Sequence, residues 1–285
     1  MASLAESAVF TAEAISRMRF STAFVRVAAG ALLLAAPTVL RAQVSLLSST
    51  VEEHEAKIGE TYTGRMVLSN PSNTPQTVRI YQTDYSFAAN GTSNYADPNT
   101  LPRSNASWVT PQASRVTVPA RQELTVPYSV KVPSSDSLKG TYWSMIMIEA
   151  AEQAPTANAG SGNVGIGSII RYGVQVATHI GATGTRAVRF DKPTATHAAN
   201  GDAMLDIEVV NTGDRAVRPK MSVEIYDANG TLKGKDKQDR GLVYPGTSFK
   251  QQFKFGSLPA GTYKVVVFAD TGDPTVRASS YTITY

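Results

Sequence analysis

The same order of strand and turn signals occurs twice in this chain, once before residue 150 and once after residue 200. In the first copy, the runs 62–70 and 76–84 flank an Asn-Pro-Ser turn, and in the second the runs 203–211 and 217–227 flank an Asn-Thr-Gly turn. Each copy continues with a Val- and Pro-containing segment (116–119 and 243–246), a further run (123–132 and 248–255) and a Gly-Thr-Tyr tripeptide that opens an apolar strand. Two tandem immunoglobulin-like β-sandwich domains explain this order better than one large barrel.

The remaining local signals also indicate an all-β chain. Short runs rich in Val, Ile, Thr and Tyr are separated by turn dipeptides, among them Asn90-Gly91, Asn200-Gly201 and Asn229-Gly230. No window after residue 42 has convincing helical periodicity. The fold class that we expect is therefore all-β.

Residues 164–179 form the stretch around which the chain is organised, and 164–176 is the candidate donor strand within it. Two alternating sets of side chains run through it, one rich in Val, Ile and Tyr and the other in Gly, which is the period of a β-strand. We expect it to be the last strand of the first domain and to lead into the hinge. The expected domains are residues 43–180 and 181–285, and the loop before this strand offers little to bury.

The N-terminus has the pattern of a secretory signal peptide over residues 1–42. Arg17, Arg19 and Arg26 precede an apolar run of 14 residues, 27–40, and Ala42 offers a small residue for cleavage. The run is shorter than the roughly 20 residues of a membrane-spanning helix, so we expect cleavage rather than an uncleaved anchor. Residues 1–17 form an extension, and Met18 is a candidate start. The expected location is the periplasm or the cell surface.

Charge and cysteine content exclude two features: a nucleic-acid partner and stabilisation by disulfides. Of 27 basic and 23 acidic residues, residues 1–42 contain four Arg and two Glu, so 23 and 21 remain. The chain has no cysteine, so an exported domain depends on its hydrophobic core alone. The densest basic cluster, 233–240, is interrupted by two aspartates; we interpret it as a solvated loop, and we expect no nucleic-acid partner.

No catalytic or metal-binding constellation is visible. His54, His179 and His197 lack metal-ligand spacing and are expected to be surface or domain-junction residues. No Gly-x-Ser-x-Gly elbow and no Cys nucleophile occur. Residues 160–165 match a dinucleotide fingerprint, but without the strand and helix that the motif requires. We expect no cofactor, no metal and no enzymatic activity.

Carbohydrate-active chemistry is a distant alternative. Its candidate carboxylates are Asp84, Asp97 and Asp136, and the sequence does not pair them.

Four aromatic residues have structural interpretations. Tyr142 and Tyr263 follow the repeated Gly-Thr and can hydrogen-bond nearby backbone, as in a tyrosine corner. Trp108 and Trp143 are expected to pack in the core of the first domain or at the rim of that core.

Residues 108–148 resemble the first domain of periplasmic pilus chaperones. The shared order is an extended segment, a Pro-containing turn, a strand, a Val-Pro-x-x-Asp loop and an aromatic strand. Residues 59–142 are also similar to the first domain of cell-surface proteins that bind WxL proteins and peptidoglycan. The matching positions there are Gly59, Asn70, Gly91, Tyr95, Pro133, Gly140 and Tyr142.

The chaperone resemblance implies β-strand addition, in which the last strand of the first domain pairs with an incomplete partner. The candidate donor side chains are Ile166, Ile170, Tyr172 and Val174. The alternative is that these residues fill their own core. The resemblance also implies a basic anchor for the partner's terminal carboxylate. Residues 44–56 contain no Arg, and Arg171 is the candidate charge.

We therefore expect an exported, non-catalytic protein that binds protein partners in the cell envelope, as a chaperone-like or adaptor module in the assembly of pili or other surface structures. The alternative is a structural accessory subunit or surface module that docks on a larger complex or on peptidoglycan through its sheet faces or the loops at 85–95.

Overall fold

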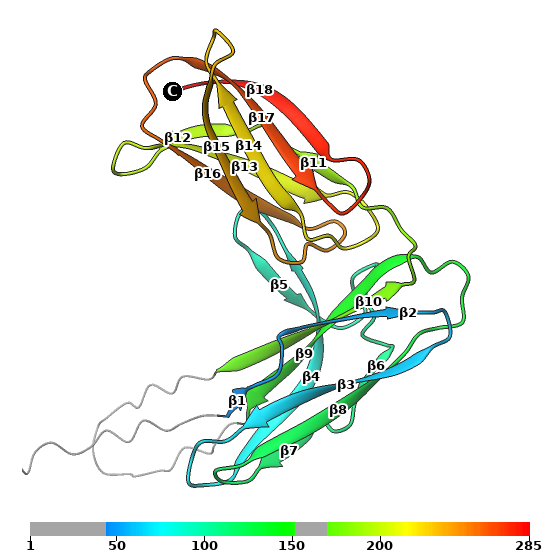
Figure 1. Ribbon diagram of the computed structural model, residues 1–285. Coiled ribbons are helices and arrows are strands. Elements are labelled where there is room, and N and C mark those ends of the chain that lie inside the picture. The colour runs from blue at the N-terminus through cyan, green and yellow to red at the C-terminus, as the bar shows by residue number, and fades with distance from the viewer. Residues whose placement is uncertain (1–43, 152–169) are drawn as a thin grey trace, which may run out of the picture. The chain divides into compact units, whose positions relative to one another are not determined.

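The computed structural model describes residues 44–151 and 170–285, which form β-strands connected by turns and loops (Figure 1). The predicted signal peptide and residues 152–169, which include Ile166 and the beginning of the strand expected from residue 164, lie outside the described residues. Among the described residues, no helix is long and apolar enough to cross a membrane.

Strands β1 to β10 form two facing sheets. One sheet has the order β1-β3-β8-β6, and the other has the order β2-β10-β9-β4-β5, with β7 also paired to β4. Their bounds are β1 Ser45–Leu46, β2 Val51–Ala56, β3 Thr61–Ser69, β4 Gln76–Phe87, β5 Ser93–Ala96, β6 Val109–Pro111, β7 Arg115–Val118, β8 Glu123–Lys131, β9 Gly140–Ala150 and β10 Arg171–Ile180.

Strands β11 to β18 form a second pair of sheets. One contains β11-β13-β12 with β16 paired to β13, and the other has the order β15-β14-β17-β18. Their bounds are β11 Val188–Phe190, β12 Thr194–His197, β13 Ala203–Asn211, β14 Lys220–Tyr226, β15 Leu232–Asp239, β16 Ser248–Gly256, β17 Thr262–Asp270 and β18 Arg277–Thr284.

Each pair of sheets encloses its own apolar core. Met66 on β3 and Ile146 on β9 come from opposite sheets of the first pair and are both fully buried. Leu205 on β13 and Val265 on β17 do the same in the second pair. The alternation seen in the sequence places every second residue of a strand in such a core, so the expected two immunoglobulin-like sandwiches are confirmed.

The expected solvated loop at 233–240 is wrong, because most of it is strand β15. β15 lies at the edge of its sheet and pairs only with β14 among the described strands. Its Lys233, Lys235 and Lys237 are exposed. Lysines on an edge strand discourage pairing with another chain, and such a strand has the composition of a loop.

The two tyrosines of the repeat differ in role. The Tyr263 hydroxyl donates to the carbonyl of Pro259 at 2.7 Å, as a tyrosine corner does. Tyr142 places its ring 4.8 Å from that of Trp108 and 5.3 Å from the guanidinium of Arg103. Trp108 and Trp143 are both buried, as expected.

Candidate functional site: the edge of β10 and the joint between the sandwiches

Among the described strands, β10 has partners on both sides along only part of its length. It pairs antiparallel with β9 from Arg171 to Ile180, but its parallel pairing with β2 begins only at Gln175. The strand that precedes β2 in the sequence, β1, pairs with β3 in the opposite sheet and so does not extend the pairing with β10. Among the described strands, therefore, none pairs with the first four residues of β10 on the β2 side; we call this stretch, Arg171 to Val174, the open edge.

The direction of the backbone groups at the open edge follows from strand geometry. Gln175 donates its N–H to the carbonyl of Thr50 at 2.9 Å, on the β2 side. Backbone groups of alternate residues point to the same side of a strand. The N–H and C=O of Gly173 and Arg171 therefore also point to that side, where an added strand could bind them.

The predicted site residues lie in different surroundings along this strand. Ile170, just before β10, is 43% exposed, and Arg171 is exposed. Tyr172 is half-buried and packs against the first core, and Val174 is 0% exposed within it. Donation of these side chains to a partner stays a prediction; for Val174 the structure shows a place in its own core.

Arg171 belongs to a cluster on the outer face of the sheet. Its Nε lies 3.1 Å from Glu149 Oε2, and Arg79 and the Tyr81 hydroxyl reach the same oxygen at 3.2 and 2.8 Å. Burial raises the pKa of Glu149, but the hydrogen bonds from Tyr81 and Arg79 and the charge of Arg171 outweigh it and lower this pKa. Arg171 is thus engaged near the open edge.

The other half of the same sheet face meets the second sandwich. The ring of Trp143 on β9 stacks on Tyr244, with centroids 4.6 Å apart and planes 8° apart. The Tyr244 hydroxyl donates to Gln175 Oε1 at 2.8 Å. Burial raises the pKa of Tyr244, which favours the protonated hydroxyl that donates this bond.

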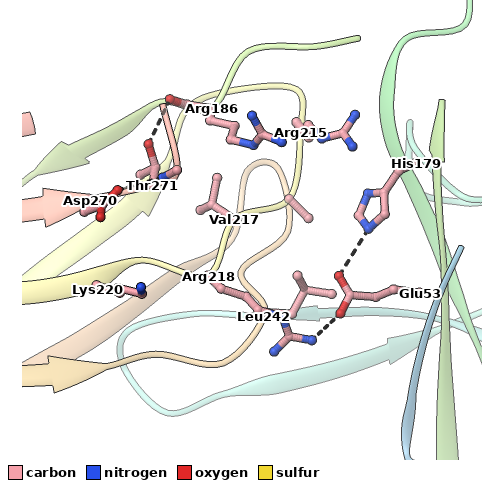
Figure 2. Close-up of a pocket in the computed structure, with 12 residues that line it drawn as sticks. Glu53, His179, Arg186, Arg215, Val217, Arg218, Lys220, Leu242, Asp270 and Thr271 are labelled. Carbon is pink, nitrogen blue, oxygen red and sulfur yellow. Dashed lines mark hydrogen bonds and ion pairs between the residues drawn. The ribbon is translucent and has the colours of Figure 1, made fainter. Parts of the chain in front are cut away.

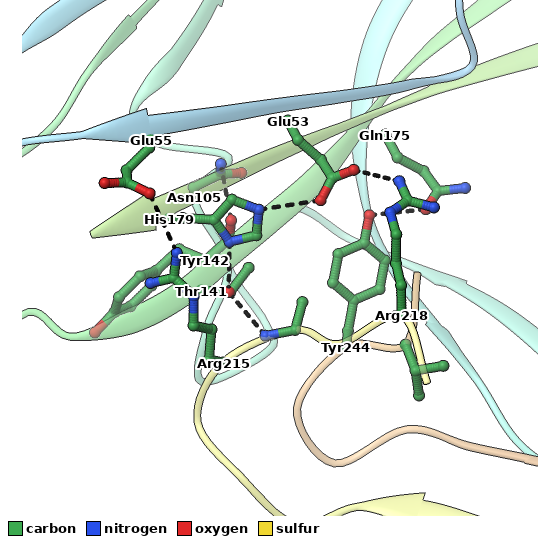
Figure 3. Close-up of polar contacts among 12 residues, drawn as sticks. Glu53, Glu55, Asn105, Thr141, Tyr142, Gln175, His179, Arg215, Arg218 and Tyr244 are labelled. Carbon is green, nitrogen blue, oxygen red and sulfur yellow. Dashed lines mark hydrogen bonds and ion pairs between the residues drawn. The ribbon is translucent and has the colours of Figure 1, made fainter. Parts of the chain in front are cut away.

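A chain of hydrogen bonds crosses the same joint (Figure 3). Ala216 donates its N–H to Thr141 Oγ1 at 2.9 Å, and Thr141 Oγ1 lies 2.8 Å from His179 Nδ1. His179 Nε2 lies 3.2 Å from Glu53 Oε2, and Arg218 donates to Glu53 Oε1. This series of hydrogen bonds therefore starts in the second sandwich at Ala216, runs through residues of β9, β10 and β2, and ends in the second sandwich at Arg218.

A cavity of about 340 Å³ opens beside this chain and is lined by both sandwiches (Figure 2). Its cationic side chains come from β14 and the segments before β11 and β14: Arg186, Arg215, Arg218 and Lys220. The Arg215 side chain is only 7% exposed and donates to the carbonyls of Gly181 and Thr183 at 2.6 and 2.9 Å. Burial and the neighbouring charge of Arg186 lower the pKa of Arg215.

The backbones of the two sandwiches touch at a glycine. Gly140, at the start of β9, has φ +73°, and a Cβ there would lie 1.8 Å from the carbonyl oxygen of Asp214. The next residue, Thr141, donates its N–H to that oxygen at 2.9 Å. Only glycine permits this approach.

The loops at 85–95, which the alternative hypothesis assigned to docking on a larger complex, contact the second sandwich in this structure. They belong to the hairpin of β4 and β5. Phe87 lies 6.5 Å from the ring of Tyr244, and Ala89 donates its N–H to Ser248 Oγ at 3.0 Å. Tyr95 is exposed, and its ring lies 5.5 Å from that of Tyr85.

The other candidate residues from the sequence do not converge. Asp84 is buried and accepts the N–H groups of Thr100 and Leu101, both at 2.7 Å, which makes it part of a turn. Asp97 and Asp136 are exposed. Within residues 44–151 and 170–285, no group of three or more His, Asp or Glu side chains could hold a metal ion.

Sequence reasoning missed Glu53, Arg215 and Arg218. Their partners are distant in the chain, since Glu53 lies 126 residues from His179 and 165 from Arg218. No local pattern marks such pairs. The only available signal was the acidic composition of β2, which a cation from elsewhere has to balance.

The sequence matches no family model and no curated protein. The chain is similar to several solved chaperone structures. The class 5 fimbriae chaperone CfaA is 10% identical, with a TM-score of 0.44 over 85% of this chain and 98% of that one. The YadV chaperone is 14% identical, with a TM-score of 0.40 over 85% and 100%. The chaperone DraB of E. coli is 13% identical, with a TM-score of 0.38 over 85% and 97%.

Proposed function

We propose that this chain is an exported, non-catalytic protein that binds a protein partner by β-strand addition at the open edge of β10. The observation that carries the proposal is the half-paired strand: among the described strands, β10 has partners on both sides from Gln175 onward and only β9 as a partner before it. An edge strand with free backbone groups is a template for another chain.

The side chains around the open edge suit a strand partner. Gly173 has no side chain, and the exposed Ile170 offers apolar surface directly before the open edge. Val174 and Tyr172 anchor the strand in its own core, so the edge is held in an extended, preorganised conformation. Backbone hydrogen bonds would supply affinity, and Ile170 would supply part of the specificity.

The partner can be identified by crosslinking from Ile170, the residue that precedes the open edge. A photoreactive amino acid at position 170 in the full chain, expressed in its native cell envelope, should capture the protein that pairs there. Several small subunits captured in substoichiometric amounts would indicate a chaperone-like assembly factor. One large complex at fixed stoichiometry would favour the structural-subunit alternative.

A matched pair of variants then tests the strand pairing itself. Arg171→Pro removes a backbone N–H that points to the open edge, whereas Arg171→Ala keeps it; both lose the guanidinium. Proline is tolerated at the first residue of a strand. We expect Arg171→Pro to bind the purified partner about tenfold more weakly than Arg171→Ala, since one buried hydrogen bond is worth about 1–3 kcal/mol. Equal affinities of the two variants would refute strand addition at this edge.

A further inference from the structure

His179 sits at the centre of the hydrogen-bond chain that joins the two sandwiches. Its side chain is 12% exposed, and each ring nitrogen has one partner: Thr141 Oγ1 at Nδ1 and Glu53 Oε2 at Nε2. Thr141 is fully buried and also accepts the N–H of Ala216, which belongs to the second sandwich. The protonation of one ring therefore decides the hydrogen bonds of both neighbours.

Donor and acceptor counting assigns the proton (Figure 3). A carboxylate only accepts, so Nε2 must carry the hydrogen that reaches Glu53. The amide of Ala216 only donates, so Thr141 Oγ1 accepts from it and keeps its own proton to donate. The hydroxyl oxygen could accept a second hydrogen bond, but among the described contacts Nδ1 is the only acceptor for its proton, so we assign Nδ1 as unprotonated.

We propose that His179 is neutral with its proton on Nε2 in the joined state, and that a second proton on Nδ1 loosens the joint between the sandwiches. We call the set Ala216, Thr141, His179, Glu53 and Arg218 the latch. With Nδ1 protonated, both ring nitrogens donate. The Thr141 hydroxyl then loses its acceptor in a buried site, which is costly.

The charged groups around His179 nearly balance, so the hydrogen-bond count decides the outcome. From β2, Glu53 and Glu55 face the ring and favour a positive imidazole. From the second sandwich, Arg215 and Arg218 oppose it, and each is already paired with one of these glutamates.

The remaining charged residues that line the cavity beside the ring also disfavour a positive imidazole on balance. They are the cations Arg186 and Lys220 and the anion Asp270. From β9, the group that faces the ring is the uncharged Thr141. What a second proton changes is therefore mainly the bond between Thr141 and His179.

Trp143 reports on the joint, because it stacks on Tyr244 there. The chain has two tryptophans, so Trp108→Phe leaves Trp143 as the single tryptophan, whose emission is then followed with excitation selective for tryptophan. We expect its emission to shift to the red in one step as the pH falls from about 8 to about 5, the range in which histidines titrate. His179→Gln in the same background should abolish the step, since glutamine can accept from Thr141 and donate to Glu53 without titrating.

The other two histidines provide matched controls. His54→Gln and His197→Gln should each leave the emission step in place. A flat titration before any histidine is changed, or a step that survives His179→Gln, would overturn the proposal.

A second measurement needs no tryptophan substitution. Nitrogen-15 NMR of the unaltered chain at about pH 8 should show His179 protonated on Nε2. Protonation on Nδ1 instead would also overturn the proposal.

Discussion

The rings of Trp143 and Tyr244 lie parallel across the joint, 4.6 Å apart, and the Tyr244 hydroxyl bonds to Gln175 on β10. Trp143 and Gln175 belong to the first sandwich, and Tyr244 belongs to the second. A buried aromatic pair of this kind gains energy from area and from ring geometry. The joint is therefore an apolar contact flanked by the polar latch.

Truncation of Tyr244 should destabilise the chain strongly. Tyr244→Ala removes a fully buried ring and should lower the free energy of unfolding by about 3–5 kcal/mol. Tyr244→Phe keeps the stack and loses only the bond to Gln175, at a cost of about 1 kcal/mol. Urea denaturation of both variants checks this, and equal losses would contradict the importance of the stack.

Gly140→Ala should disrupt the backbone contact with Asp214. Gly246 is the control, because its φ of +76° is nearly the same but a Cβ there would meet nothing within 4 Å. Gly246→Ala should cost about 1–2 kcal/mol from its positive φ alone. Gly140→Ala should cost at least about twice that in thermal or urea unfolding, since backbone must move. Similar costs would mean that the joint accommodates a methyl group there.

Lysine substitutions should distinguish the exposed Ile170, which precedes the open edge, from the buried Val174 within it. Val174→Lys places a charge in the first core and should cost more than about 4 kcal/mol or prevent folding. Ile170→Lys should cost at most about 1 kcal/mol, because Ile170 is 43% exposed. Circular dichroism and urea titration distinguish the two. A folded, stable Val174→Lys variant would show that this side chain can leave the core.

The stability contributed by Glu53 should disappear in acid. The hydrogen bond from His179 lowers the pKa of Glu53, burial opposes this, and Arg218 lowers it further, from 4.5 to about 2. A carboxyl group whose pKa is lower in the folded state stabilises that state at pH values above its pKa in the unfolded state. This stabilisation is lost as the pH falls from about 4.5 toward about 2.

Glu53→Gln tests this dependence. The unaltered chain should be more stable than the variant at about pH 7, and the difference in unfolding free energy should shrink toward about pH 3. A difference that stays constant between these pH values would mean that Glu53 does not ionise differently on folding.

Much of the fold could be predicted from local pattern. The run 203–211 was expected to be a strand, and its alternation matches the burial of Leu205 and Ile207. The Asn-Gly dipeptides marked turns whose glycines have positive φ, as at Gly201 and Gly230. Strand β15 was missed because an edge strand exposed to water has the composition of a loop. The start of β10 was expected at residue 164; the described part begins at Arg171.

The candidate site was only partly visible. The sequence drew attention to β10 and to Arg171, but Arg171 pairs with Glu149 instead of lining the cavity between the sandwiches. The cavity's cations come from the second sandwich, whose loops carried no such signal. Tyr244 was noted only as part of a repeated turn.

The sequence by itself determined the period of two, the positions of the turns and hence two sandwiches with separate cores, because these depend on neighbouring residues in the chain. The tertiary structure decided which stretch of β10 has no partner on the β2 side among the described strands, and that Glu53, His179 and Arg218 meet at one joint. Those outcomes depend on which strands pair and on contacts between residues more than a hundred positions apart. A side-chain period specifies a face of a strand, and only the packed chain specifies what lies against it.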